Sequence, residues 1–415
     1  TSVPNIMKVI EPLFLNELYE EFDNACHPDN SIKNPAKYKA DKLKALLNRI
    51  ADIRIFDPAC GSGNFLIISY RELRKLEIKI LKKMDDRELF SRIELKHFYG
   101  IEISDFSCEV AVLSLWLAEH QMNRIFMDEF GQCNPTLPLR EAGHIVCGNA
   151  TRLNWTEVCP RCGKETYILG NPPYLGASLQ SSAQKSDMEK VFCHVDNYKN
   201  LDYIACWFLL AGQYVKNGND CFAFVSTNSI CQGEQVAILW NELLKYGHIS
   251  FAYKSFKWSN NAKYNAGVTC IIIGFESNKN SLRRIYTKER MITTDNITPY
   301  LISGNNFIIS KRNDSISKLP EMLYGSKATD GGALSLSPEE RNTLLDKYVD
   351  MQNFIKYFIG SEEAINGKDR YCLWLTADDY KLVSKYQEIE ERIAICKNFR
   401  QNSPKAATRK LAGVP

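Results

Sequence analysis

One stretch determines how the rest of this 415-residue chain can be arranged: Ile53-Arg54-Ile55-Phe56-Asp57-Pro58-Ala59-Cys60-Gly61-Ser62-Gly63-Asn64-Phe65-Leu66. A short β-branched and aromatic run ends in Asp57, and residues 65–84 then have the spacing of an amphipathic helix. This order predicts a strand, a tight turn and a helix. Because Gly61 and Gly63 lack a Cβ, the turn lets a ligand approach the backbone closely. Its spacing differs from the dinucleotide fingerprint and from the P-loop, so a phosphate site is the weaker interpretation.

A second stretch, Gly170-Asn171-Pro172-Pro173-Tyr174, follows the apolar residues 166–169. Two adjacent prolines remove two backbone donors and fix φ twice, so the carbonyls around them point outward. Asn171 adds a side-chain acceptor and Tyr174 adds an aromatic face. Acceptors beside an aromatic ring suit a planar group that carries an NH₂. The alternative interpretation is a purely structural turn.

Together these stretches resemble motifs I and IV of the amino-methylating DNA methyltransferases, which use S-adenosylmethionine. Their order, cofactor loop before catalytic loop, resembles the γ arrangement typical of adenine-N6 enzymes. Further strings resemble the methyltransferase part of single-chain type II restriction–modification enzymes of the MmeI kind: residues 9–15, 223–229, 256–260, 360–363 and 365–368. The resemblance covers nearly the whole chain.

The resemblance implies an α/β fold with two parts. Residues 1–290 are expected to form a doubly wound, Rossmann-like, S-adenosylmethionine-dependent methyltransferase sheet. Residues 291–415 are expected to form a partial target-recognition region that binds DNA. The composition changes after Glu276, and Arg283 and Arg284 lie in what we interpret as a linker. A nuclease and the remainder of the recognition domain are expected outside these residues.

Several residues are expected to contact the cofactor. An acid at the end of the second strand, Glu102, is placed to accept hydrogen bonds from ribose hydroxyls, although a solvated glutamate is the alternative. In the family Glu102 matches motif II and Asn149 matches motif III, while Thr1 is the remnant of motif X. The full expected set is Thr1, Asp57, Ala59, Gly61, Gly63, Glu102, Ile103, Asn149 and Ala150.

The resemblance assigns catalysis to Asn171, Pro172, Pro173 and Tyr174. The Asn171 carboxamide and the Pro172 carbonyl would accept the two hydrogens of an exocyclic amine. The target base must leave the duplex to reach them, and it would stack on Tyr174 and on Phe256, the match to motif VIII. A core aromatic at a strand end is the alternative for Phe256.

Three other segments suggest weaker hypotheses. Cys159 and Cys162 have the spacing of half a zinc knuckle, but a matching second pair is absent, so a surface turn without metal is the preferred interpretation. Residues 176–199 have the composition of a mobile loop that could close over DNA. Residues 394–415 carry basic side chains and no acid, which suits phosphate contacts or a solvated charge run.

Composition and charge limit the classes of protein to which this chain can belong. The chain is 45% hydrophobic, has no apolar run near the roughly 18 residues of a membrane span, and is expected to be cytoplasmic. Its 14 cysteines lie mostly in apolar segments, which favours reduced thiols. A net charge of +3 does not by itself indicate nucleic acid.

The sequence therefore predicts a site-specific DNA methyltransferase of a restriction–modification system. It would act on the N6 amine of a flipped adenine in double-stranded DNA, with S-adenosylmethionine as cofactor. One alternative is a protein glutamine-N5 methyltransferase, against which the long segment after Glu276 counts. The other is a non-catalytic DNA-binding module on a methyltransferase scaffold, against which the intact stretch 171–174 counts.

Overall fold

The computed structural model describes residues 2–29, 32–84, 90–133, 143–216, 218–257, 269–277, 282–312, 317, 320 and 325–413. The chain forms two compact units, the first ending at Arg312 and the second comprising the residues after it. Thr1, the string 258–260 and the turn 259–265 expected between two strands lie outside the described residues. Within the described part, no helix has the length and apolarity needed to cross a bilayer.

The first unit is built on a sheet of nine described strands in the order β3-β2-β1-β4-β5-β7-β6-β8-β9. The five strands from β3 to β5 are parallel, and β7 runs antiparallel to both of its neighbours. The strand order reverses between β1 and β4, and this switch point is where open α/β sheets bind ligands. The bounds are β1 (Arg54–Asp57), β2 (Phe98–Glu102), β3 (His144–Cys147), β4 (Thr166–Gly170), β5 (Cys221–Thr227), β6 (His248–Lys257), β7 (Thr269–Glu276), β8 (Arg283–Tyr286) and β9 (Met291–Thr294).

Helices cover both faces of this sheet because successive strand residues alternate between two cores. Ile55 and Leu169 face one core and their neighbours Phe56 and Ile168 face the other. The first core is covered by α1 (Val3–Ile10), a π-helical turn (Glu11–Leu15), α2 (Asn16–Cys26), α3 (Pro35–Asp52), α4 (Asn64–Met84) and α5 (Asp105–Phe130). The second is covered by α6 (Trp155–Val158), α7 (Ser182–Phe192), α8 (Ala205–Val215) and α9 (Glu234–Leu243). The doubly wound fold is confirmed.

Two segments differ from the sequence-based expectation. Residues 176–199, expected as a mobile loop, contain α7 between two short 3₁₀ turns (Ala177–Leu179 and Tyr198–Asn200). Ser181 and Gln184 form a reciprocal capping box, and Met188 and Phe192 are buried in the second core. The expected linker is also wrong, because Arg283 and Arg284 belong to β8, which pairs with β6 and β9.

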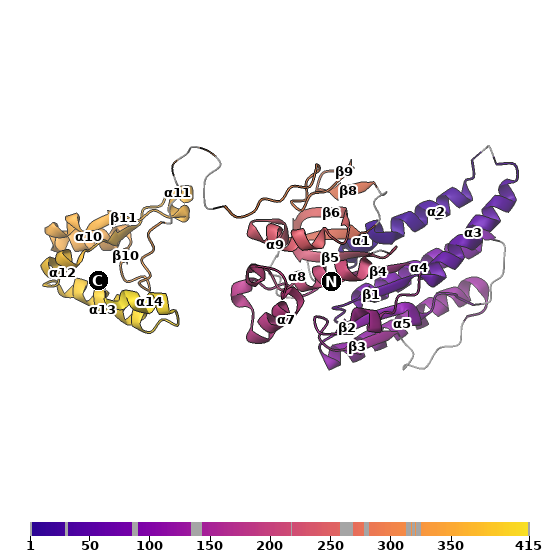
Figure 1. Ribbon diagram of the computed structural model, residues 1–415, viewed down its shortest axis with the longest axis horizontal. Helices are drawn as coiled ribbons and strands as arrows, with labels where there is room; N and C mark the ends of the chain where they lie inside the picture. Colours follow the sequence, from indigo (N-terminus) through magenta and orange to yellow (C-terminus); the bar gives the residue numbers. More distant parts are fainter. Residues whose placement is uncertain are drawn as a thin grey trace. The chain divides into compact units, whose positions relative to one another are not determined.

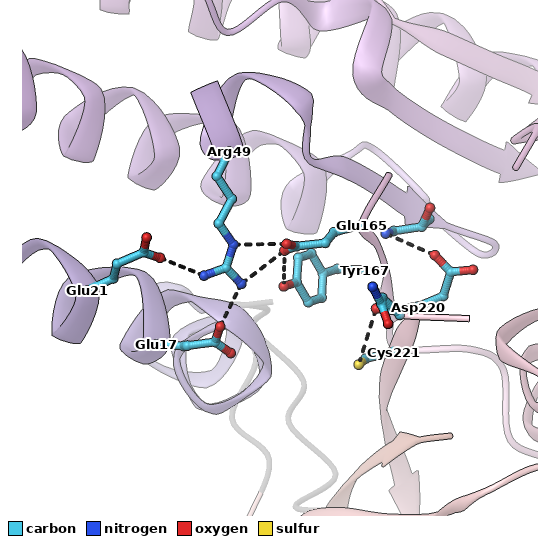
Figure 2. Close-up of polar contacts among 9 residues, drawn as sticks. Glu17, Glu21, Arg49, Glu165, Tyr167, Asp220 and Cys221 are labelled. Carbon is cyan, nitrogen blue, oxygen red and sulfur yellow. Dashed lines mark hydrogen bonds and ion pairs between the residues drawn. The ribbon is translucent and has the colours of Figure 1, made fainter. Parts of the chain in front are cut away.

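Helices α2 and α3 lie side by side (Figure 1). Arg49, on α3, connects both helices to the amino end of β4 through hydrogen-bonded ion pairs. Arg49 donates to Glu17 at 2.6 Å and to Glu21 at 2.7 Å, both on α2. Its Nε donates to Glu165, just before β4, at 2.9 Å, and Tyr167 also donates to Glu165 at 2.8 Å (Figure 2). This network lies at the end of β4 opposite to Asn171 and is therefore structural.

The second unit contains a small antiparallel sheet in the order β10-β12-β11. Its core includes Leu336, Met351, Val383 and Ile389. Arg400, from the expected basic tail, is buried and donates to the carbonyls of three residues at 3.1–3.2 Å, so it supports the fold. The bounds are β10 (Ser335–Leu336), β11 (Ile355–Tyr357), β12 (Tyr371–Leu373), α10 (Pro338–Lys347), α11 (Ser361–Asn366), α12 (Ala377–Val383), α13 (Gln387–Gln401) and α14 (Ala406–Lys410). The remaining 3₁₀ turns among the described residues are Leu95–His97, Asn228–Cys231, Val349–Asn353 and Leu411–Gly413.

Candidate functional site

A cavity of about 630 Å³ lies where β1, β2 and β4 end. This volume is within the roughly 300–1,000 Å³ typical of small-molecule sites. The cavity is lined by residues of both stretches quoted above, by the ends of β2 and β3, and by α7 and α8. Of the expected site residues, it brings together Ala59, Glu102, Ile103, Asn149, Ala150, Asn171 and Pro173.

The loop after β1 orients the carboxylate at the end of β2. Gly61 has a φ of 53° and donates its backbone N–H to Glu102 Oε2 at 2.9 Å. Ser104 N donates to Glu102 Oε1 at 3.1 Å. A Cβ at Gly61 would meet nothing within 4 Å, so the positive φ rather than crowding favours glycine there. Each carboxylate oxygen accepts one of these bonds and keeps lone-pair capacity for a hydroxyl donor.

Asp57 lies beneath the cavity rather than in its wall. Its carboxyl is buried, with Oδ1 accepting from Ala59 N at 3.0 Å. Burial raises the pKa of Asp57 to about 8, against the opposing effect of the Ala59 hydrogen bond. A Cβ at Gly170 would lie 2.6 Å from Asp57 Oδ1, so any larger residue before Asn171 would have to displace the Asp57 carboxyl. Gly63 also faces away from the cavity, because its Cβ would lie 3.3 Å from Ala111 Cβ on α5.

The stretch after β4 contains an acceptor without a hydrogen-bond donor in the described part of the chain. Asn171 lines the cavity, and its Oδ1 is buried without a hydrogen-bond partner among the described residues. A buried acceptor left unpaired costs about 1–3 kcal/mol, so one in a cavity wall requires a functional explanation. Pro172 is buried and Pro173 is exposed to the cavity. Trp207, on α8, donates its Nε1 to Pro58 O at 3.0 Å and so joins the loop after β1 to α8 in the same wall.

Neither of the two expected stacking residues lines this cavity. Burial and, to a smaller extent, the Cys270 thiol on β7 raise the pKa of the half-buried Tyr174. Phe256, on β6, is paired in register with Cys270. Lys8 Nζ lies 4.9 Å from the centre of the Phe256 ring. Phe256 packs against the first core and Tyr174 against the second, so they lie on opposite faces of the sheet.

Helix α7 contributes wall residues that sequence reasoning missed. Asp187 accepts from Asn149 Nδ2 at 3.0 Å, from Arg152 Nε at 2.7 Å and from Tyr203 OH at 2.8 Å. Asn149 Oδ1 in turn accepts from Thr151 N at 2.9 Å and from the Thr151 hydroxyl at 2.7 Å. A capping pattern beginning at Ser181 could have located the helix, but nothing local marks Asp187 as its buried acid.

The two cysteines considered for zinc face different surroundings. Cys159 is fully buried in the second core, whereas Cys162 is exposed. In the described part of the chain, no three His, Cys, Asp or Glu side chains lie together as a metal site.

The chain resembles known protein families in both of its units. Residues 33–287 match the family model of the MmeI DNA-methyltransferase domain, and residues 303–415 match that of the MmeI target recognition domain. The chain is 48% identical over 425 aligned residues to DNA methyltransferase A of Bacillus subtilis (strain 168), covering 100% of this chain and 47% of that protein. It is 38% identical over 128 residues to a putative type II restriction enzyme and methyltransferase of Methanocaldococcus jannaschii, covering 29% of this chain and 11% of the relative.

A solved structure is similar to this chain over its full length. It is the type IIL restriction-modification enzyme MmeI in complex with DNA, with a TM-score of 0.89 and 38% identity, covering 100% of this chain and 56% of that one. The chain thus spans about half the length of these two long relatives, MmeI and the Bacillus protein. With more than half of its residues matched by one family model, the chain belongs to the MmeI DNA-methyltransferase family.

Proposed function

We propose that this chain is the methyltransferase and recognition part of a site-specific DNA methyltransferase that modifies adenine at N6. The observation that carries the proposal is that Asn171, which lines the cavity, has a buried Oδ1 without a hydrogen-bond partner among the described residues. The N–H of an exocyclic amine would donate the hydrogen bond that this acceptor lacks. The family membership and the recognition-domain match support DNA as the carrier of that amine.

The cavity suits S-adenosylmethionine. Its volume fits a ligand of that size, and Glu102 at the end of β2 offers acceptors for ribose hydroxyls. Ile103 and Ala150 provide apolar surface for an adenine ring. When bound, the cofactor supplies an electrophilic methyl group. Among the expected cofactor residues, Gly61 acts through Glu102, while Asp57 shapes the turn from below.

The chain's own contribution is to orient the amine. The adenine amine is a weak nucleophile because its lone pair is delocalised into the ring. When Asn171 Oδ1 and the Pro172 carbonyl accept its two hydrogens, the nitrogen becomes more tetrahedral and the lone pair turns out of the ring plane. Such positioning supplies most of the rate enhancement. Tyr174 and Phe256 stack on the extruded base and offset part of the few kcal/mol that unstacking costs.

Two other functions are weaker. Glutamine-N5 methylation poses the same chemical problem, but it does not explain the match of residues 303–415 to a target recognition domain. A non-catalytic module does not explain why a buried acceptor beside a ligand-sized cavity has no partner among the residues that the structure describes.

Product analysis tests the proposal. Duplex DNA is incubated with the full-length protein and S-adenosylmethionine carrying a labelled methyl group, and the digested nucleosides are separated. We expect label in N6-methyladenine, and we expect none with Asn171→Ala. Label in N4-methylcytosine would overturn the adenine assignment. Label in protein glutamine, or no transfer with cofactor bound, would overturn DNA methylation.

A further inference from the structure

Asp187 is a buried carboxylate in the wall of the proposed cofactor cavity, outside every motif in the sequence. It is 2% exposed and comes from α7. Burial disfavours its charge, but hydrogen bonds from Arg152, Asn149 and Tyr203 outweigh burial and hold the pKa of Asp187 below its usual value. The cavity therefore contains a fixed, ionised acceptor.

The hydrogen bonds around Asp187 leave one of its oxygens partly free. Asp187 Oδ2 accepts from Asn149 and from Tyr203, whereas Oδ1 accepts from Arg152 alone among the described residues. A carboxylate oxygen has two lone pairs, so Oδ1 can accept a second hydrogen bond. The carbonyl oxygen of Asn149 already accepts twice from Thr151 and is less available. Asp187, more than Asn149, is the acceptor open to a ligand.

A donor stands beside this acceptor. Arg152 also lines the cavity, and its side chain is 47% exposed. Only its Nε is used by Asp187, and its terminal amino groups make no hydrogen bond within the described part of the chain. The cavity wall therefore offers an acceptor next to donors. Adenine presents the complementary pair, because its 6-amino group is a donor and the neighbouring ring nitrogen is an acceptor.

We propose that Asp187 and Arg152 select the adenine of the cofactor, with Asp187 Oδ1 accepting from the 6-amino group and Arg152 donating to the adjacent ring nitrogen. This inference rests on the proposed function, because it requires S-adenosylmethionine in this cavity. The placement agrees with the rest of the site, since Ile103 and Ala150 line the same cavity and Glu102 lies at the ribose position. The pair is a specificity determinant and takes no part in the chemistry.

The proposal predicts discrimination between two purines. Hypoxanthine carries a 6-oxo group in place of the amine. Its 6-oxo oxygen is an acceptor and would face the ionised Asp187 carboxylate, which is also an acceptor. We expect the wild-type protein to bind S-adenosylhomocysteine about 100-fold more tightly than S-inosylhomocysteine, because the mismatch leaves buried polar groups unpaired.

Calorimetry of the full-length protein with both compounds measures this ratio without catalysis. Asp187→Asn should weaken binding of S-adenosylhomocysteine and reduce the ratio to about tenfold or less, since a carboxamide can donate to the 6-oxo group. Glu189→Gln is the matched control, an exposed acid on the same helix, and it should leave affinity and ratio unchanged. Thermal unfolding of each variant checks that the fold is retained.

The outcomes separate this proposal from the one it rests on. If the wild-type protein binds neither compound, the proposed cofactor is wrong. If it binds S-adenosylhomocysteine but Asp187→Asn keeps the wild-type ratio, only the adenine-selecting role is wrong. Should Asp187→Asn fail to fold, Arg152→Met decides, because this half-exposed side chain tolerates substitution and its loss should also reduce the ratio. A ratio unchanged in Arg152→Met would then overturn the proposal.

Discussion

Gly61 and Glu102, 41 residues apart in the sequence, are joined by a hydrogen bond from the Gly61 N–H to Glu102 Oε2 at 2.9 Å. The loop after β1 and the end of β2 are therefore one preformed surface. The glycine turn therefore has a second role besides its closeness to a ligand: it orients the Glu102 carboxylate, which we assign to the ribose hydroxyls.

Gly61→Val should weaken binding of S-adenosylhomocysteine by about tenfold or more, roughly 1.4 kcal/mol. A β-branched residue is strained at the φ of 53° and will move the N–H away from Glu102. Gly131→Val is the matched control. Gly131 caps α5 with a φ of 78°, and a Cβ there would also meet nothing within 4 Å. Calorimetry should show normal affinity in the control although both variants are less stable. Equal affinity losses would contradict the assignment.

Asn171→Ala should reduce methyl transfer more than Tyr174→Ala does. Removing the carboxamide leaves the amine poorly oriented, and we expect a loss of roughly 100-fold or more in the single-turnover rate on saturating DNA. Losing one stacking face removes about 1–3 kcal/mol while the acceptors remain. Cofactor affinity should stay within about tenfold for Asn171→Ala. The reverse order of rates would show that Asn171 does not orient the amine.

Arg49→Met should lower the free energy of unfolding by about 2 kcal/mol, because it leaves three carboxylates close together without their cation. Lys96→Met breaks the exposed pair with Glu94 and should cost less than about 0.5 kcal/mol. Urea titrations of both variants measure the difference. Cofactor affinity should be unchanged in Arg49→Met, since the network lies at the other end of β4.

The stability of the first unit should fall as pH rises from about 4 to about 8 because of Asp57. In the unfolded chain an Asp ionises near a pH of about 3.9, whereas the folded pKa of Asp57 is about 8. Between these values unfolding releases a proton, so each pH unit costs at most about 1.4 kcal/mol, and the decline ends above pH 8. Asp57→Asn should remove this slope. Urea titrations from pH 5 to 9 compare the two proteins, and parallel curves would contradict burial as the cause.

The places of the loop after β1 and of the stretch 171–174 at strand ends could be predicted because their signals are local. Asp57, Gly61 and the run 171–174 combine special backbone demands with unusual residue types, and the sequence places each at a strand end. Strands β1 and β4 and helix α4 were expected close to their observed bounds for the same reason. Hydrophobic periodicity is strongest where a segment is buried.

Other elements depend on contacts that no local pattern records. Helix α7 is polar, and only its capping box marks its beginning. Strand β8 is four residues long and contains two arginines, so its composition suggests a linker. Only its pairing with β6 and β9 in the structure identifies it as a strand. Asp187 and Glu189 are both acids on one helix, yet one is buried and the other exposed. The difference arises from Asn149, Arg152 and Tyr203, which are remote in sequence.

The close approach of Gly170 to Asp57 links two positions that a motif description treats separately. A methyl group at position 170 would overlap the carboxyl of residue 57, so the two sites share one small volume. Relatives should therefore change them together, with alanine at 170 accompanied by a shorter side chain at 57. Gly170, which precedes Asn-Pro-Pro-Tyr, would then be retained because Asp57 on the neighbouring strand leaves no room for a larger residue. The presence of this glycine alone would say little about the reaction.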